Sequence, residues 1–335
     1  MAAWDITSYA YSGTSLDVSG FSGSASDLFF KTDGLKLYVL DRTSDAVGEY
    51  DLGTAWDIST ATFTDSFSVA SQEAFPIGMF IGSAGSKLYV VGIVSGSVHE
   101  YDLSTAWDVS TSTFNQSFSV SSQETEPTGL SFSDNGLRMF VVGAIGDDVN
   151  EYALSTAWDI STATFTDSFS VASQSAGPTD VTFGDSGSEM YVSDSASAEV
   201  YQYTLSTAFD VSTATYTGSL DVSSQSTSPF GVSFRGNGEN LFIIDSRDVV
   251  YQYRLPVAVT SAATMAGTST FTPFPSNIIT VATMAGTSAL SGAGASATAT
   301  SGRAVDEASA GGTSAALSVS LNSAITEPTN PTRNT

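Results

Sequence analysis

The sequence predicts an all-β protein in which residues 1–255 form a five-bladed β-propeller and residues 256–335 form a low-complexity extended tail. First, a marker, Ala-(Trp/Phe)-Asp-(Ile/Val), recurs about every 51 residues. Second, a glycine recurs in register with it, and third, each repeat holds four short segments of alternating polarity. A period near 50 residues is typical of propellers and solenoids. The marker aromatics are Trp4, Trp56, Trp107, Trp158 and Phe209, and the glycines are Gly34, Gly85, Gly136, Gly187 and Gly238.

Each repeat contains four predicted strands, A to D, which the third repeat illustrates. They cover residues 128–133, 139–142, 149–154 and 164–171. Apolar residues alternate with polar ones along these segments, which is the pattern of half-buried strands. Nothing in the repeat has the length and periodicity of a helix. Four strands in about 50 residues is the content of one propeller blade.

The two ends of the repeat region predict how the ring closes. Five A, five B and five C segments lie between Leu28 and Leu255, but only four D segments do. The missing D segment is at the N-terminus, where Tyr11, Leu16 and Val18 occupy the D positions. We therefore expect the N-terminal strand to complete the last blade, which leaves the ring without an open end.

Two stretches carry a resemblance to a known family. Residues 31–40 (KTDGLKLYVL) and 134–142 (DNGLRMFVV) resemble the repeats of YVTN/NHL-type propellers. The resemblance covers residues 1–255 and implies the propeller fold. It implies no single activity, because such propellers serve as enzymes, scaffolds and binding modules.

Composition excludes several classes of function. Ten basic and 35 acidic residues give a net charge of −25, which argues against nucleic-acid binding. Only 13% of residues are charged, against about 25% in an average protein, and this is typical of proteins outside cells. The absence of cysteine excludes disulfides and thiolate metal sites. There is no apolar run of about 18 residues for membrane insertion, and the N-terminus does not resemble a secretory signal.

The repeated residues have two interpretations each. The marker aromatic is either a packing residue at a folded corner, with its Asp capping the turn, or one of a ring of five sugar-binding aromatics. We favour packing. Asp134, Asn135 and Asp185 carry side-chain oxygens of the kind that bind calcium, but their spacing does not match a calcium loop. No cofactor or metal is therefore predicted.

The variable loops are the predicted place for a partner, because binding residues concentrate on loops held by a rigid scaffold. The B–C and D–A loops of a blade fall on the same rim, which is acidic apart from two arginines. Neutral change of the sequence in solvent-exposed loops explains the acidic residues of this rim equally well. The candidate ligand-binding residues are Arg42, Glu73, Phe75, His99, Glu126, Asp147, Asp194, Phe230 and Arg247.

The sequence favours a protein that is not an enzyme, with no catalytic residues. The inner strands offer only Asp27 and Asp180, on different blades, and lone acids at strand starts are usually turn or rim residues. His99 is the only histidine, so a histidine-based triad or metal cluster is not available.

Residues 256–335 are rich in Ala, Ser, Thr and Gly, and contain the sequence ATMAGTS twice, from Ala263 and from Ala282. Short strands are predicted at 257–260 and 278–281. A segment that does not bury its own core is often ordered by a partner, so we expect this tail to attach the protein to other subunits and to favour a homo-oligomer.

These features together predict a structural protein of a phage particle. The tail would contact other virion subunits, and the propeller would project as a decoration or host-contacting module for a cell-surface glycan or receptor. The expected location is the virion. The alternative is a bacterial surface or secreted adhesin exported without an N-terminal signal.

Overall fold

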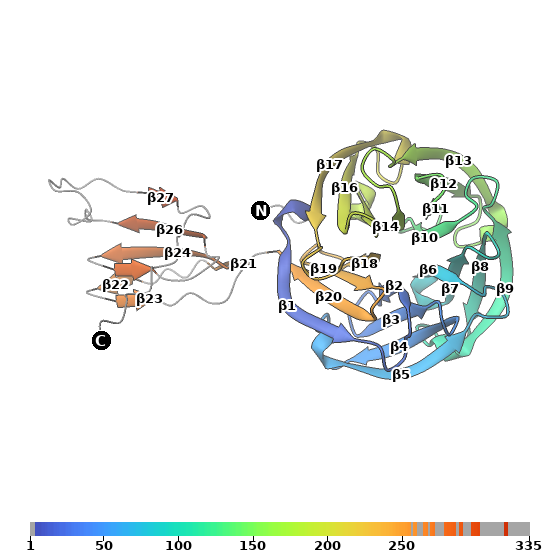
Figure 1. The fold of residues 1–335 in the computed structure, drawn as a ribbon, viewed down its shortest axis with the longest axis horizontal. Coiled ribbons are helices and arrows are strands. Elements are labelled where there is room, and N and C mark those ends of the chain that lie inside the picture. Colours follow the sequence, from blue (N-terminus) through green and yellow to red (C-terminus); the bar gives the residue numbers. More distant parts are fainter. Residues whose placement is uncertain are drawn as a thin grey trace, which may run out of the picture. The chain divides into compact units, whose positions relative to one another are not determined.

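The computed structural model describes residues 4–255 in full, and seven strands within the rest of the chain. The chain divides into two units, Met1–Arg254 and Leu255–Thr335. The first is the predicted propeller: five sheets of four antiparallel strands are arranged in a ring (Figure 1). Blade 1 is β2-β3-β4-β5, blade 2 is β6-β7-β8-β9, blade 3 is β10-β11-β12-β13, blade 4 is β14-β15-β16-β17, and blade 5 is β18-β19-β20-β1.

The strands of the propeller occupy equivalent positions in the five blades. The inner strands are β2 (Ala25–Phe30), β6 (Pro76–Gly82), β10 (Pro127–Phe132), β14 (Pro178–Gly184) and β18 (Pro229–Phe234). The second strands are β3 (Lys36–Asp41), β7 (Lys87–Gly92), β11 (Arg138–Gly143), β15 (Glu189–Asp194) and β19 (Asn240–Asp245). The third strands are β4 (Ala46–Leu52), β8 (Ser97–Leu103), β12 (Asp148–Leu154), β16 (Glu199–Leu205) and β20 (Val249–Arg254). The outer strands are β1 (Ala10–Asp17), β5 (Ala61–Ser68), β9 (Ser112–Ser119), β13 (Ala163–Ser170) and β17 (Ala214–Asp221).

Short 3-10 helices complete the blades. Those at the corners between third and outer strands are η1 (Ile6–Ser8), η2 (Ile58–Thr60), η4 (Val109–Thr111), η5 (Ile160–Thr162) and η7 (Val211–Thr213). Two more, η3 (Ser83–Gly85) and η6 (Asp185–Gly187), form turns after inner strands.

The predicted closure is confirmed. The N-terminal strand β1 pairs antiparallel with β20, so that Tyr11 lies opposite Tyr253 and Leu16 opposite Val250. Strands from the two ends of the propeller sequence therefore share one sheet (Figure 1).

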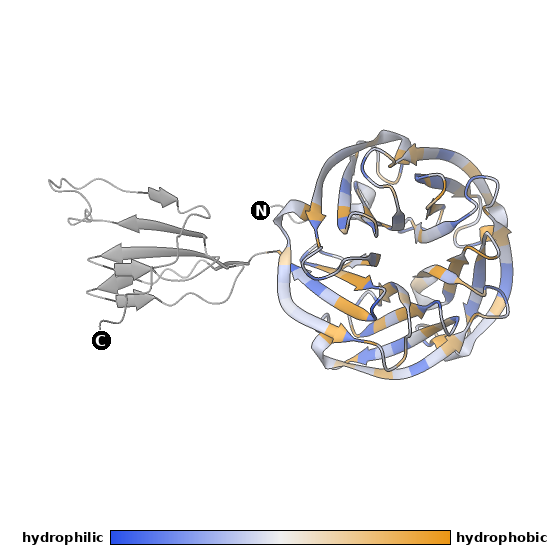
Figure 2. Cartoon of the chain, viewed as in Figure 1, coloured by the Kyte–Doolittle hydropathy of each residue, from blue (hydrophilic) through white to orange (hydrophobic). Residues whose placement is uncertain are grey.

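The hydrophobic core lies between blades. Hydrophobic residues alternate with polar ones along the strands (Figure 2), as half-buried strands require. One apolar cluster joins Tyr38 and Leu40 of blade 1 to Met79, Ile81 and Leu88 of blade 2. Because each core is shared by two neighbours, no blade buries its apolar face alone.

Hydrogen bonds reinforce each junction between blades. Tyr38 and Tyr89 on second strands donate their hydroxyls to the carbonyls of Trp107 and Trp158 in the next blade, at 2.7 and 2.6 Å. The third strand adds a buried acceptor: Glu49 accepts from the Val109 amide at 3.0 Å. We call this set of bonds the corner lock.

The marker aromatic is the packing residue that the sequence favoured. Trp56 has φ of 65°, and its amide donates to the Gly34 carbonyl at 2.9 Å. A Cβ on Gly34 would lie 2.3 Å from the indole Nε1, so only glycine lets the ring lie against this turn. Asp57 accepts a bond from the Ser59 amide at 3.1 Å and caps η2, as predicted.

The second unit contains β21 (Val257–Val259), β22 (Thr264–Ala266), β23 (Ser269–Phe271), β24 (Ile278–Ala285), β25 (Ser288–Leu290), β26 (Ser296–Ser301) and β27 (Ser318–Ser320). The strands expected at 257–260 and 278–281 correspond to β21 and β24, which pair in parallel.

Replacing Tyr89 by Phe tests the corner lock. Tyr89 is fully buried, and Tyr89→Phe leaves the Trp158 carbonyl without its donor. We expect the free energy of unfolding to fall by about 1–2 kcal/mol in urea titrations, the cost of an unmade buried hydrogen bond. The matched control is Tyr216→Phe, since that exposed tyrosine lies on the outer strand β17 and should change stability little. Equal losses in both variants would contradict the lock.

Candidate functional site

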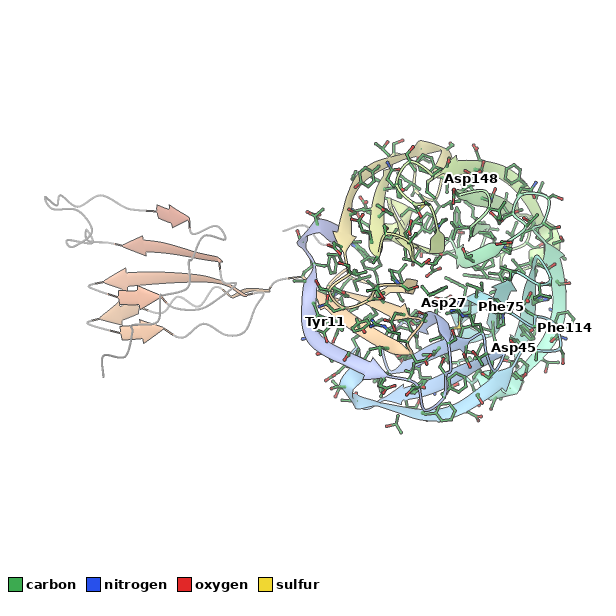
Figure 3. The ribbon with its side chains drawn as sticks, viewed as in Figure 1. Tyr11, Asp27, Asp45, Phe75, Phe114 and Asp148 are labelled. Carbon is green, nitrogen blue, oxygen red and sulfur yellow. The ribbon has the colours of Figure 1, made fainter. Side chains whose placement is uncertain are left out.

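Three of the nine predicted rim residues converge at one end of the central axis. The guanidinium carbon of Arg42 lies 4.4 Å from the ring centroid of Phe230 and 5.7 Å from that of Phe75. These residues come from blades 1, 5 and 2. We call this end, where the second strands run into the third strands, the loop mouth. Figure 3 shows Asp27 near the centre of the ring, Phe75 further out, and Tyr11 and Phe114 at its outside.

Glu73 is a buried loop clamp. It is fully buried and accepts bonds from the amides of Phe75 and Ser95, at 2.9 and 3.0 Å, and from the Ser95 hydroxyl at 2.6 Å. A Cβ on Gly92 would lie 2.6 Å from its carboxyl carbon, so the glycine makes room for the acid.

In blade 1 the same clamp is built from the other side of the loop. Asp41, the counterpart of Gly92, accepts from the Ser24 amide at 3.0 Å and from the Ser44 hydroxyl at 2.6 Å. Asp194 has the same position in blade 4 and accepts from the Ser175 hydroxyl at 2.6 Å. These bonds lower the pKa of Asp41 and Asp194, even though burial opposes the shift.

Among the other predicted rim residues, His99 lies beside Glu73, with its Nε2 4.0 Å from Glu73 Oε2. His99 is buried, its Nε2 lies 2.9 Å from the Ser95 hydroxyl, and burial lowers its pKa. Arg247 pairs with Asp245 at 2.5 Å. Asp147 occupies a turn with φ of 49°, and Glu126 is exposed.

Asp27 and Asp180 occupy the centre of the propeller. They are 2% and 4% exposed and belong to a ring of equivalent positions on the inner strands. Asp27 accepts from the amides of Leu28 and Met79, at 2.7 and 2.6 Å, and Asp180 from those of Val181 and Val232, at 2.7 and 2.9 Å. The ring consists of Asp27, Gly78, Gly129, Asp180 and Gly231.

Burial dominates the electrostatics of this pair. It raises the pKa of Asp27 well above its ordinary value, and the neighbouring charge of Asp180 raises it further. Burial also raises the pKa of Asp180 to about 8. Glycine fills the remaining positions because space is short: a Cβ on Gly231 would lie 2.5 Å from Asp27 Oδ1, and one on Gly129 would lie 2.5 Å from Asp180 Cα.

The other end of the axis holds a cavity of about 290 Å³ to which all five inner strands contribute. We call it the corner mouth, because the marker residues Trp4, Trp56 and Phe209 also line it. Its axial ring departs from the repeat. Two phenylalanines on blades 1 and 2 face three hydroxyl residues on blades 3, 4 and 5: Phe29, Phe80, Ser131, Thr182 and Ser233.

The hydroxyls of this ring have no protein partner. Phe29 and Phe80 touch edge to face, with centroids 5.1 Å apart. Within residues 4–255, the side chains of Ser131, Thr182 and Ser233 make no hydrogen bond. The corner mouth therefore combines an apolar wall with three free hydroxyls, and sequence reasoning missed it because the inner strands were treated only as core.

A larger cavity, of about 530 Å³, lies at the junction of blades 3 and 4. Its charged groups serve the corner lock: Arg138 pairs with Glu151 at 2.5 Å and donates to the Phe209 carbonyl at 2.8 Å. Arg138 and Glu151 are therefore engaged between the blades.

The described residues lack two further features. They contain no group of three or more His, Cys, Asp or Glu side chains placed to hold a metal ion. They also contain no helix with the length and apolarity to span a membrane.

The raised pKa of Asp180 predicts how stability depends on pH. Between about pH 4 and pH 8 the folded state binds more protons at this carboxyl than the unfolded state, so the free energy of unfolding falls as pH rises through that window. Asp180→Asn should reduce the slope, measured by urea unfolding across a pH series, by at least about 1 kcal/mol over the window. Asp65→Asn, at an exposed position of β5, is the control and should keep the slope. An unchanged slope in Asp180→Asn would contradict the assignment.

No family model matches the chain, and no curated protein matches it. Among solved structures, it is similar to a functionally unknown protein from Desulfotomaculum acetoxidans DSM 771, with 10% identity and a TM-score of 0.42 over 66% of this chain and 62% of the other. It is also similar to two proteins named as putative 6-phosphogluconolactonases. The one from Bacteroides uniformis ATCC 8492 has 13% identity and a TM-score of 0.42 over 66% and 64% of the two chains. The one from Bacteroides fragilis NCTC 9343 has 14% identity and a TM-score of 0.42 over 64% and 61%. The chain thus covers somewhat over three-fifths of the length of these structures.

The comparisons run against the prediction that the chain is not an enzyme, since two of the similar structures are named as putative 6-phosphogluconolactonases; that name belongs to those proteins. The premise of the prediction fails as well: Asp27 and Asp180 are not lone rim acids. Closure of the ring brings both to the buried centre, where the charge of Asp180 acts on Asp27 and backbone amides bind both carboxylates.

Proposed function

We propose that the propeller is a carbohydrate-binding module whose ligand occupies the corner mouth. The observation that supports this most directly is the arrangement of Phe29 and Phe80 opposite the free hydroxyls of Ser131, Thr182 and Ser233. Ligand sites are typically concave and mostly apolar, with a few convergent polar groups.

A sugar ring matches both halves of this cavity. Its C–H face is apolar and packs on an aromatic surface, and its hydroxyls both donate and accept hydrogen bonds, as Ser and Thr hydroxyls do. The volume of about 290 Å³ is at the lower end for ligand pockets, which favours one or two sugar units.

The position of these residues within the repeat also favours a ligand. Neighbouring ring positions keep one type of residue in all blades, such as the apolar set Leu28, Met79, Leu130, Val181 and Val232. The corner mouth instead divides into aromatic and hydroxyl residues. The three hydroxyls line the cavity, so a ligand there can reach them.

The wider setting of this proposal comes from the sequence. From the sequence we also propose that the chain belongs to the YVTN/NHL-type propellers and is part of a phage particle. Residues 256–335 would attach it to other virion subunits. The support for this setting is the acidic, cysteine-free composition, the repeat motifs and the low-complexity tail. The alternative is a surface or secreted adhesin, for which the same carbohydrate site would serve.

Replacing Phe80 by Ser tests the binding site. The change introduces the residue that blades 3 and 5 already carry at this position, and it should weaken binding about tenfold or more, because the aromatic wall is lost. A glycan array identifies the probe, and fluorescence titration then measures its affinity, since Trp4 and Trp56 line the cavity. Phe114→Ser, at an exposed aromatic of the outer strand β9, is the control and should bind normally. Equal affinity in both variants, or no ligand on the array, would count against the site.

Ending the chain at Leu255 tests the tail. We expect the full chain to form oligomers and the shortened chain to be monomeric in light scattering after gel filtration, because residues 256–335 are rich in Ala, Ser, Thr and Gly and contain few large apolar residues for a core of their own. The assembly role would be excluded if the shortened chain formed the same oligomer.

A further inference from the structure

We infer that the loop mouth is a second ligand site, in which Arg42 binds the carboxylate of a small anionic ligand. This site lies at the opposite end of the inner strands from the corner mouth, and the inference does not depend on the proposed carbohydrate site. It rests on how Arg42 is held and on the hydrogen-bonding groups that it leaves free.

Arg42 is held in place by uncharged neighbours. Its Nε donates to the Ser24 hydroxyl at 2.8 Å, and its guanidinium lies against the Phe230 ring, with Phe75 further away. Both phenylalanines are half-buried. The terminal Nη groups make no hydrogen bond within residues 4–255, so the edge of the guanidinium that fits a carboxylate is unused.

The acids near Arg42 are already engaged. Both carboxylate oxygens of Asp41 accept hydrogen bonds from the groups of its loop clamp, including those of Ser24 and Ser44. Asp248 accepts through Oδ1 alone, from the Ser22 hydroxyl at 2.8 Å and from the Ala25 amide at 2.7 Å. Neither forms an ion pair with Arg42, although both lie close enough to favour its charge.

This situation is unusual within the protein. Among residues 4–255, the lysines and arginines other than Arg42 and Arg254 each pair with a carboxylate: Lys31, Lys36, Lys87, Arg138, Arg235 and Arg247. Arg254 is exposed to solvent, whereas Arg42 is half-buried between blades. In a chain of net charge −25, a half-buried arginine that has no acid partner calls for a counterion from outside.

The geometry favours a carboxylate as that counterion. A guanidinium presents a planar fork of N–H groups that matches the two oxygens of a carboxylate, and stacking on Phe230 holds the plane of the fork. Partial burial strengthens the interaction, because fewer water molecules compete for the same groups. Phe75 supplies an apolar surface for the carbon skeleton of the ligand.

The probes are glucuronate, its neutral counterpart glucose, and inorganic phosphate, each titrated into the full chain by calorimetry. We expect glucuronate to bind and glucose not to bind at this site. Arg42→Gln should weaken glucuronate binding about tenfold or more, and Arg42→Lys should weaken it as well, because lysine keeps the charge and loses the fork. Arg254→Gln is the matched control, with the same change of charge, and should bind like the unmodified protein. Phe80→Ser, at the corner mouth, should leave the Arg42-dependent binding unchanged.

Several results would overturn the inference. They are no binding of glucuronate to the unmodified protein, equal weakening in Arg42→Gln and Arg254→Gln, or phosphate bound more tightly than glucuronate. If Arg42→Gln does not fold, the side-chain Nε–Hε resonances of the unmodified protein decide the question by NMR. Glucuronate and not glucose should shift one arginine resonance, which is lost in Arg42→Lys. The absence of a shift would mean that Arg42 serves only to hold the loops together.

Discussion

The corner lock is the interaction on which the rest of the propeller depends. Each corner exposes a carbonyl and amides that must find partners once they are buried between blades, and the preceding blade supplies them. The lock persists where the repeat changes. In blades 3 and 5 the tyrosine is replaced by Phe140 and Phe242, and the carbonyl of the next corner is then bound by Arg138 or Gln252. The donor changes between blades, but the buried acceptor is always satisfied.

A closed ring of five locked blades leaves a narrow axis, and this narrowness determines the chemistry at its centre. The inner strands approach so closely that three of the five central positions are glycine. The other two are Asp27 and Asp180, whose charges are poorly solvated there. The repeat is broken at both ends of the axis: at the corner mouth by two phenylalanines against three hydroxyls, and at the loop mouth by Arg42 with Phe230.

The loop clamps explain why much of the predicted rim is structural. A carboxylate is needed at each of these loops to bind several amides, and it comes either from Glu73, opposite a glycine, or from Asp41 and Asp194 on the second strand. In the sequence alone, this change in the position of the acid from blade to blade looks like unconstrained variation of surface residues. Only the shared hydrogen-bond partners reveal that the acids are equivalent. The same loops bring Arg42, Phe75 and Phe230 together, which the sequence indicated as members of one rim but not as neighbours.

The sequence by itself determined the architecture. The period, the alternation within each strand and the N-terminal strand predicted five blades and their closure, because strand polarity and repeat length are local properties of the chain. It also indicated that the marker tryptophans pack at corners. The axial sites were decided only by the tertiary structure, since residues such as Asp27 and Asp180 are distant in sequence and meet through ring closure. The burial of these residues, the interaction of their charges and the unpaired hydroxyls arise only in the closed ring. No local pattern in the sequence predicts them.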